Sequence, residues 1–308
     1  MPLPARTRPN EATGALSNAS KGLPLPARPF LKWAGSKQQL RAAFAPLYPA
    51  PDKKAGYHEP FLGSGAVFFD VRDRFSRRRC TLSDGNPDLI AAFTAVRDEV
   101  ERVIEALLAH RERHCEKHFY ATRAIPLEQL EALSPVERGA RLIYLNKTCF
   151  NGLYRVNSRG LFNVPMGSYT RPSIVDPDAL RLASAALQGV RLTVAPFASV
   201  LTRARAGDVV YFDPPYVPLN ETAYFTSYMK TAFGEGEQQA LATVYRTLDA
   251  RGCKLMLSNS DTPLVRKLYA GFHQHQVMAR RNINSRGDRR GHVAELVVCN
   301  YVPGCVLD

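Results

Sequence analysis

The chain has 308 residues, of which 45% are hydrophobic and 22% charged, as is usual for a water-soluble globular protein. Its formal net charge of +13 favours a polyanionic partner such as nucleic acid, although a merely basic enzyme fits the charge equally well. The sequence has no apolar run of membrane-spanning length, no signal-peptide core at its start and no Cys-x-x-Cys pair. We therefore expect a cytoplasmic protein with neither a membrane segment nor a metal site.

The first 27 residues are rich in Pro, Ala, Ser and Asn without periodicity, which predicts a disordered tail. The ordered part begins at 29–37, an extended segment that leads into a helix predicted from about Ser36 to Leu47. Trp33, the only tryptophan, lies between two lysines of this segment. It is either a core residue or a pocket wall for a flat, charged ligand.

The stretch 57–69 has the pattern of a strand, a glycine-rich turn and a helix. Gly63 and Gly65 would let the backbone approach a ligand closely, next to the free N–H groups of a helix start. A second short strand ends in Asp84, about 20 residues further on, which is the usual spacing for a carboxylate that binds ribose hydroxyls. NAD, FAD and S-adenosylmethionine all fit this pattern.

The middle of the chain is predicted to be mainly helical. Apolar residues recur every three or four positions from Asp88 to Leu107, which predicts one long amphipathic helix. A second helix should begin at 134–137, where Ser, Pro and Glu form a capping box with proline in the first turn. The hairpin-like stretch 146–169 then holds Asn, Arg, Gly and aromatic residues but no acid. This composition favours contacts with nucleic-acid bases over an ordinary turn-rich loop.

The apolar run from Val209 to Phe212 predicts a buried strand that ends in Asp213-Pro214-Pro215-Tyr216. Two prolines cannot continue a central strand, so the chain must break where open α/β sheets bind their ligands. A carboxylate and rigid backbone carbonyls can accept the hydrogens of an amino group attached to a ring, and a tyrosine can stack on that ring. A strand followed by a tight turn is the alternative.

The remaining pattern predicts a helix at 235–250, a strand at 254–259 and a helix capped by Asp261 or Thr262. Two further strand-like runs, 272–278 and 293–301, flank a basic loop at 280–292. Its five arginines suggest contacts with phosphates, and a solvated hairpin tip is an equal alternative.

Five blocks of sequence occur in a characteristic order. They are 30–37 (FLKWAGSK), 59–65 (EPFLGSG), 144–146 (YLN) with 151–169, 213–216 (DPPY) and 257–261 (LSNSD). Together they resemble the Dam-type DNA adenine-N6 methyltransferases, and the resemblance covers the chain from Pro29 onward. It implies an α/β fold with a methyltransferase Rossmann-like mixed sheet and an inserted, mainly helical target-recognition domain that carries a β-hairpin. The implied parts are a disordered tail (1–27), a first catalytic part with the cofactor pocket (28–84), the recognition insert (85–188) and a second catalytic part (189–308).

The resemblance also implies S-adenosylmethionine as the cofactor and double-stranded DNA as the partner of a protein that we expect to be monomeric. The implied cofactor-binding residues are Trp33, Lys37, Phe61, Gly63, Gly65, Asp84 and Asp213. Members of the family usually have a second glycine where this chain has Ser36. If that position requires a positive φ, serine is strained there, with a small expected effect on geometry.

By the same resemblance, Asp213, Pro214 and Tyr216 are the catalytic residues. Asp213 and the Pro214 carbonyl would each accept one hydrogen of the adenine amino group, and Tyr216 would stack on the base once it has left the duplex. The implied DNA-binding residues are Lys32, Phe150, Asn151, Leu153, Arg155, Pro165, Tyr169, Arg281, Arg286, Arg289 and Arg290. Phe150 lies where family members wedge an aromatic side chain into the duplex, and the expected target is GATC.

Other hypotheses remain open. An RNA adenine or a DNA cytosine-N4 methyltransferase would use the same amino-group chemistry. A nicotinamide oxidoreductase would explain Gly63, Gly65 and Asp84 but not the Asp-Pro-Pro-Tyr segment, and a catalytically silent DNA-binding protein would not need Asp213 or Tyr216. A cytosine-C5 methyltransferase commonly has its nucleophilic cysteine after a proline, and no Pro-Cys pair is present. Whether a partner nuclease exists is also open.

Overall fold

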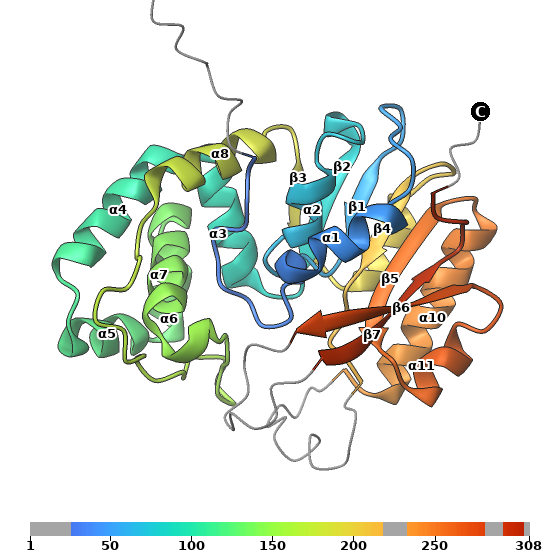
Figure 1. Cartoon of the computed structure of the whole chain (residues 1–308). Helices are drawn as coiled ribbons and strands as arrows, with labels where there is room; N and C mark the ends of the chain where they lie inside the picture. Colours follow the sequence, from blue (N-terminus) through green and yellow to red (C-terminus); the bar gives the residue numbers. More distant parts are fainter. Residues whose placement is uncertain (1–25, 218–232, 281–291, 305–308) are drawn as a thin grey trace, which may run out of the picture.

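The computed structural model describes residues 26–217, 233–280 and 292–304, and the statements below refer to these residues. They form a seven-stranded mixed sheet with the order β3-β2-β1-β4-β5-β7-β6 (Figure 1). The strands are β1 (Tyr57–Glu59), β2 (Cys80–Asp84), β3 (Arg191–Val194), β4 (Val209–Phe212), β5 (Lys254–Ser260), β6 (His273–Arg280) and β7 (His292–Cys299). Neighbours among the first five strands pair in parallel, whereas β7 is antiparallel to both β5 and β6. This is the mixed α/β sheet that the sequence predicts.

The strand order places a ligand site at the carboxyl ends of β1 and β4. From β1 the chain proceeds outward through β2 to β3 and then returns to the other side of β1 to form β4. Such a reversal of strand order opens a crevice above the two central strands. Glu59 ends β1 and Phe212 ends β4, so the predicted Asp213 follows at the crevice.

The amino ends of the central strands are held together by one buried carboxylate. Asp208, directly before β4, accepts hydrogen bonds from the Gly56 backbone N–H and the Arg79 guanidinium, each at 2.7 Å. Its second oxygen lies 3.2 Å from Nε2 of His58 on β1. A buried carboxylate requires such partners, and here they fix the relative positions of β1 and β4.

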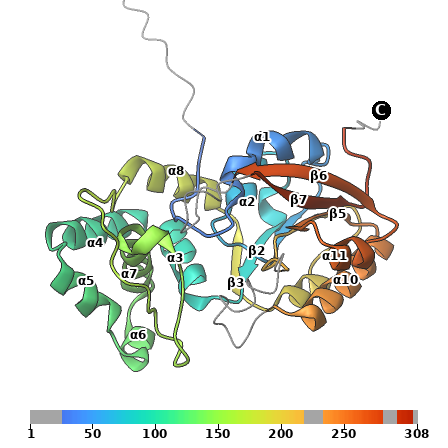
Figure 2. The same ribbon diagram turned by 60° about the horizontal axis from the view of Figure 1, so that its bottom comes forward.

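Helices cover both faces of the sheet. The regular helices are α1 (Arg41–Phe44), α2 (Ala66–Val71), α3 (Pro87–Asp98), α4 (Val100–Glu112), α5 (Glu116–Arg123), α6 (Leu127–Ala132), α7 (Pro135–Thr148), α8 (Pro177–Leu187), α10 (Glu235–Ala250) and α11 (Pro263–Leu268). Short 3₁₀ helices are η1 (Lys37–Leu40), η2 (Ala45–Leu47), η3 (Arg77–Arg79), η4 (Phe150–Gly152) and η5 (Phe197–Thr202). Helices α10 and α11 lie on one side of the sheet and α1 and α2 on the other (Figure 2). Val210 and Phe212 pack in the core on the side of α10 and α11, whereas Val209 and Tyr211 pack in the core shared with α1 and α2. The alternation of side chains along β4 therefore supplies both cores.

Helices α3 to α8 gather beyond the β3 edge of the sheet (Figure 1). The single long helix predicted from Asp88 to Leu107 is wrong, because the chain bends at Glu99 (φ −140°, ψ 46°) and divides into α3 and α4. Both helices pack against α7, so the apolar periodicity continues across the bend although the axis changes direction. One hydrophobic core extends from the sheet through α3 to α7. The assignment of residues 85–188 to a separate recognition domain stays a prediction.

Several local predictions are confirmed. Ser134 and Glu137 form the predicted capping box at the start of α7, and α10 spans 235–250 as expected. Thr262, one of the two candidate caps, accepts the hydrogen bond at the start of α11. The hairpin-like stretch contains two isolated antiparallel bridges, Cys149 with Met166 and Val156 with Phe162. None of the described helices is long and apolar enough to cross a membrane.

The crossing of α3 and α7 depends on Gly139, where a Cβ atom would lie 3.0 Å from Ala92 Cα and 3.0 Å from Ala95 Cβ. We predict that Gly139→Leu lowers the free energy of unfolding by about 1–3 kcal/mol, because the helices must separate. Gly236→Leu in α10 is the matched control, since a Cβ there meets nothing within 4 Å. Urea denaturation measures both variants, and equal stability of the two would contradict this packing.

Candidate active site

The carboxyl ends of β1, β2 and β4 open into one cavity of about 910 Å³. Its wall contains residues of the N-terminal segment (29–37), the glycine-rich loop between β1 and α2 (60–65), the end of β2 and the Asp-Pro-Pro-Tyr segment (213–216). Of the predicted cofactor-binding residues, Trp33, Lys37, Phe61, Gly63, Asp84 and Asp213 line this cavity, as do the predicted catalytic residues Pro214 and Tyr216. Segments far apart in the sequence thus meet where the strand order places the crevice.

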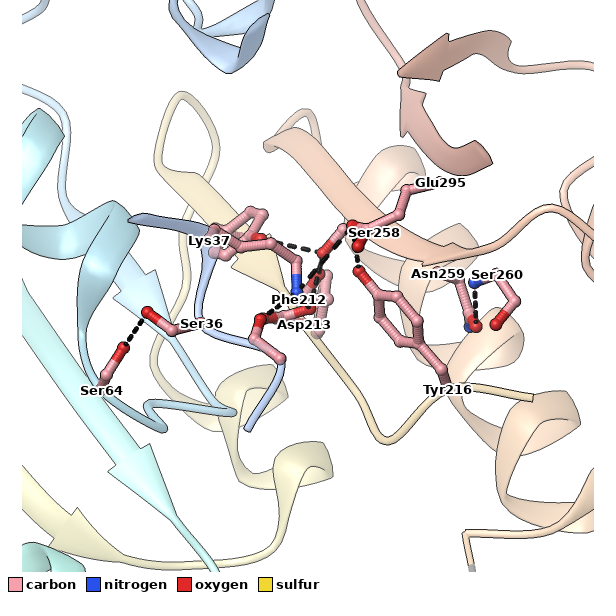
Figure 3. Close-up of polar contacts among 12 residues, drawn as sticks. Ser36, Lys37, Ser64, Phe212, Asp213, Tyr216, Ser258, Asn259, Ser260 and Glu295 are labelled. Carbon is pink, nitrogen blue, oxygen red and sulfur yellow. Dashed lines mark hydrogen bonds and ion pairs between the residues drawn. The ribbon is translucent and has the colours of Figure 1, made fainter. Parts of the chain in front are cut away.

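Lys37 forms a buried ion pair with Asp213. Its ammonium Nζ lies 2.8 Å from Asp213 Oδ1 and donates a hydrogen bond to the Gly35 carbonyl at 2.6 Å (Figure 3). Only 3% of Lys37 is exposed, so the charge depends on these partners. The residue predicted to contact the cofactor therefore also contacts the predicted catalytic carboxylate.

Asp213 has a second polar partner, Ser258 of β5. The Ser258 hydroxyl donates to Asp213 Oδ1 at 2.7 Å and lies 2.8 Å from the Tyr211 hydroxyl (Figure 3). The contacts from Lys37 and Ser258 both engage Oδ1, so Oδ2 is the oxygen that can turn to a ligand. Ser258 lies beside Asp213 because the preceding residues pair: Leu257 of β5 is opposite Phe212, the last residue of β4.

Tyr216 is held at its hydroxyl, which donates to Glu295 Oε2 of β7 at 2.7 Å (Figure 3). Lys37 Nζ lies 4.7 Å from the centroid of the same ring. Burial, followed by the carboxylates of Asp213 and Glu295, raises the pKa of Tyr216 well above its usual range. Tyr216 is therefore a neutral aromatic side chain at every physiological pH.

The backbone after Asp213 is held from behind by α10. Gln238 donates a hydrogen bond from Nε2 to the Pro215 carbonyl at 3.0 Å. Asn259 donates to the Gln238 side chain at 3.0 Å and accepts from the Val217 N–H at 3.3 Å. Because Gln238 and Asn259 are fully buried, these bonds fix the segment that presents Pro214 and Tyr216.

The glycine-rich loop requires Gly63. Its φ is +49°, and a Cβ atom there would lie 3.1 Å from Cδ1 of Trp33. The Gly63 N–H donates to Asp84 Oδ2 at 3.1 Å, and the Asn86 N–H donates to Oδ1 at 2.9 Å. Burial raises the pKa of Asp84, and these backbone hydrogen bonds oppose the shift. Gly65 is not among the residues that line the cavity, because it packs toward the core below the loop.

Ser36 is unstrained in this structure. Its φ is −53°, whereas the neighbouring Gly35 has the positive φ of +77°. The Ser36 hydroxyl lies 2.9 Å from the Ser64 hydroxyl and so links the N-terminal segment to the glycine-rich loop (Figure 3). The condition under which serine would be strained does not arise.

Sequence reasoning missed three polar side chains of the site: Glu59, Ser258 and Glu295. Glu59 and Ser258 lie within the sequence blocks that carry the resemblance, and this was an available signal. Glu59 ends β1, and Ser258 lies two residues before the end of β5. Glu295 follows no motif, and only the antiparallel pairing of β7 with β5 brings it to the site.

Three of the predicted DNA-binding residues lie together near the hairpin. Phe150 is 49% exposed and Tyr169 is 37% exposed, and Lys32 Nζ lies 4.3 Å from the Tyr169 ring centroid. Asn146 joins the hairpin-like stretch to the segment 29–37. Its side-chain oxygen accepts a hydrogen bond from the Lys32 N–H, and its side-chain nitrogen donates to the carbonyls of Lys32 and Gly152. These hydrogen bonds attach the hairpin-like stretch to Lys32, the residue directly before Trp33 in the cavity wall.

The other predicted DNA-binding residues divide into two groups. Asn151 is exposed and has a φ of 54°, a conformation that asparagine tolerates, and Arg155 donates from Nε to the Asn163 side chain at 2.7 Å. Leu153 and Pro165 belong to the same hairpin-like stretch. Outside the described residues lie Arg281, Arg286, Arg289 and Arg290.

Comparison with known families matches residues 33–283 to the D12 class N6 adenine-specific DNA methyltransferases. The chain belongs to this family. It is 41% identical over 286 residues to the type II methyltransferase M.MjaIII of Methanocaldococcus jannaschii, a match that covers 89% of this chain and 99% of that protein. It is also 36% identical over 281 residues to the DNA adenine methylase of Escherichia coli, with 91% and 97% of the two chains covered.

Family membership confirms the predicted resemblance, and the chain is an adenine-specific DNA methyltransferase. A second type II methyltransferase, M1.LlaDCHI of Lactococcus lactis, is 37% identical over 277 residues, with 89% of this chain and 95% of that one covered. These matches favour adenine in DNA over the RNA, cytosine-N4 and oxidoreductase hypotheses. The roles of the individual site residues stay predictions.

Glu59 should make stability depend on pH. Burial raises its pKa from 4.5 to about 8, while a hydrogen bond from the Tyr57 hydroxyl opposes the shift. The protonated carboxyl stabilises the fold fully below pH 4.5, and this contribution is lost as the pH rises through about 8. We predict that the free energy of unfolding of the wild type falls, relative to Glu59→Gln, between these two pH values.

Urea denaturation at a series of pH values measures this difference. Glu59→Gln is a suitable comparison because its amide oxygen can still accept the hydrogen bond from Tyr57. A difference between the two proteins that does not change with pH would mean that Glu59 titrates in its usual range.

Proposed function

We propose that the chain transfers the methyl group of S-adenosylmethionine to N6 of an adenine that has been extruded from duplex DNA, within the sequence GATC. The observation that carries the proposal is that Asp213 and Tyr216 share one cavity with the glycine-rich loop and Asp84. A nucleoside cofactor and an extruded base must meet in such a common space for direct transfer.

The lining of the cavity fits S-adenosylmethionine in shape and in charge. Trp33 and Phe61 offer aromatic faces, Gly63 leaves room where a Cβ atom would crowd Trp33, and Asp84 ends β2. Asp84 and Asp213 line the cavity, and their carboxylates would favour a positively charged ligand. When bound, the cofactor supplies a methyl group on a sulfonium. Trp33, Phe61, Gly63 and Asp84 would hold its nucleoside part.

The chain's own residues activate the amino group of adenine. That nitrogen is a poor nucleophile because its lone pair is delocalised into the ring. In our proposal Asp213 accepts one amino hydrogen through Oδ2 and the Pro214 carbonyl accepts the other, so that the lone pair becomes available. Lys37 and Ser258 keep Oδ1 in place, and Tyr216 stacks on the base. Methyl transfer would then be direct, without a covalent enzyme intermediate: an N–CH3 bond replaces the S–CH3 bond of the sulfonium, and the proton that the amino nitrogen loses would pass to Asp213 and from there to water.

Base extrusion follows from the location of this site inside a cavity. An adenine amino group within a stacked duplex cannot reach Asp213, so the base must leave the helix. The exposed ring of Phe150 is available to fill the gap in the stack, and Lys32 and Tyr169 form an exposed cation and ring nearby. Asn151, Leu153, Arg155, Pro165 and Tyr169 would read the GATC site.

Replacement of Asp213 tests its assigned role. We predict that Asp213→Ala lowers methyl transfer to duplex DNA at least about 100-fold, because the amino group loses its hydrogen-bond acceptor. Transfer of radiolabel from S-adenosylmethionine measures the rate, and calorimetry measures cofactor binding separately. Asp178→Ala, at an exposed carboxylate of α8, is the control. Full activity of Asp213→Ala would remove Asp213 from the mechanism.

The GATC assignment has its own test. DNA from a methyl-free host that expresses the chain should resist a nuclease whose cleavage at GATC is blocked by adenine methylation. Nucleoside analysis of the same DNA should yield N6-methyladenine, whereas N4-methylcytosine would indicate the alternative chemistry. GATC sites that are still cut, in DNA that does contain N6-methyladenine, would show that the enzyme recognises another sequence.

A further inference from the structure

Glu295 is a polar side chain of the site that comes from the antiparallel part of the sheet. It lies on β7 opposite Ser260 of β5, two residues beyond Ser258. Its Oε2 accepts the 2.7 Å hydrogen bond from the Tyr216 hydroxyl, which joins two points 79 residues apart in the chain (Figure 3). Glu295 is not among the residues that line the cavity, so it reaches the site through two residues that do, Tyr216 and Lys37.

The surroundings of Tyr216 make this contact strong. The Glu295 side chain is 16% exposed, and its Oε2 lies 4.0 Å from Lys37 Nζ. A hydrogen bond from a hydroxyl to a carboxylate is roughly twice as strong as one between neutral groups, and partial burial adds to it. Pro214 and Pro215 restrict the backbone directly before Tyr216. The freedom that remains to Tyr216 is therefore mainly in its side-chain torsions. The hydroxyl contact limits that freedom.

We propose that Glu295 is a positioning residue for methyl transfer: by accepting the hydrogen bond from Tyr216, it fixes the ring in the orientation on which the extruded adenine stacks. This inference rests on the proposed role of Tyr216 in the function above. A ring that can swing away would present the base amino group to Asp213 in only a fraction of encounters. The rate of transfer, rather than the affinity for the cofactor, should therefore depend on Glu295.

Four variants separate this role from other contributions. Tyr216→Phe keeps the ring but removes the donor, and Glu295→Ala removes the acceptor. We predict that each slows single-turnover transfer about tenfold, in line with the loss of a hydrogen bond to a charged group. The double variant should be no slower than either single variant, because all remove the same link. Glu295→Gln should stay within about threefold of wild type, since its amide oxygen can still accept.

Two measurements besides the rate are needed. The fluorescence of 2-aminopurine at the target adenine reports how the extruded base stacks, and it should change in Glu295→Ala and Tyr216→Phe alike. Cofactor affinity by calorimetry should be unchanged in both. Asp261→Asn is the matched control, because this carboxylate follows β5, pairs with Arg266 and does not line the cavity. It should leave transfer and fluorescence as in the wild type.

Several results would overturn the inference. Wild-type rates for Glu295→Ala, or a double variant whose loss is the product of the single losses, would show that the two residues act separately. A Glu295→Gln variant as slow as Glu295→Ala would mean that the negative charge near Lys37 matters instead. If Glu295→Ala fails to fold, the double variant Glu295→Gln, Tyr216→Phe replaces it, and its single-turnover rate must equal that of Tyr216→Phe alone. If the wild type itself does not methylate duplex DNA, the proposed function fails, which is a distinct outcome.

Discussion

The buried ion pair between Lys37 and Asp213 is the constraint on which the rest of the site depends. An ammonium that is almost fully buried is tolerated only beside its counter-charge, so the N-terminal segment must pack against the end of β4. This contact joins two parts of the cavity wall, the segment that contains Trp33 and the Asp-Pro-Pro-Tyr segment. It also directs Oδ1 of Asp213 toward Lys37, whereas Oδ2 is the oxygen that we propose accepts from the substrate. The same interaction thus shapes the cavity and orients its central acceptor.

The sheet topology explains how residues from three strand ends line one cavity. β1 separates β2 from β4, so Asp84 and Asp213 stand on either side of Glu59 at the same edge of the sheet. The helical stretch between β2 and β3 returns to this edge, where Tyr154 stacks on Trp33 with 5.4 Å between ring centroids. The segment expected to touch DNA therefore packs directly against the wall of the cavity. In the proposed function, recognition of the duplex and chemistry on the extruded base would share this packing.

Local signals were sufficient for much of this structure. The buried strand before Asp213 and the capped start of α7 each follow from a few adjacent residues and are present as expected. The bend at Glu99 was not predictable, because α3 and α4 bury a continuous apolar stripe against α7 whether or not the axis bends. Contacts set by strand pairing were also beyond reach, since nothing near Glu295 in the sequence indicates that it meets Tyr216. Ser36 is unstrained because the positive φ lies one residue earlier, a detail that the sequence pattern does not resolve.

The most direct test of this account is a crystal structure of the chain with S-adenosylhomocysteine and a duplex that contains one GATC site. The account predicts an adenine outside the helix with its ring on Tyr216 and its amino nitrogen within hydrogen-bond distance of Asp213 and the Pro214 carbonyl. It also predicts that the sulfur of the cofactor product faces that nitrogen across the same cavity. An adenine that remains stacked in the duplex, or one bound away from Asp213 while the cofactor product occupies the cavity, would contradict the central claim.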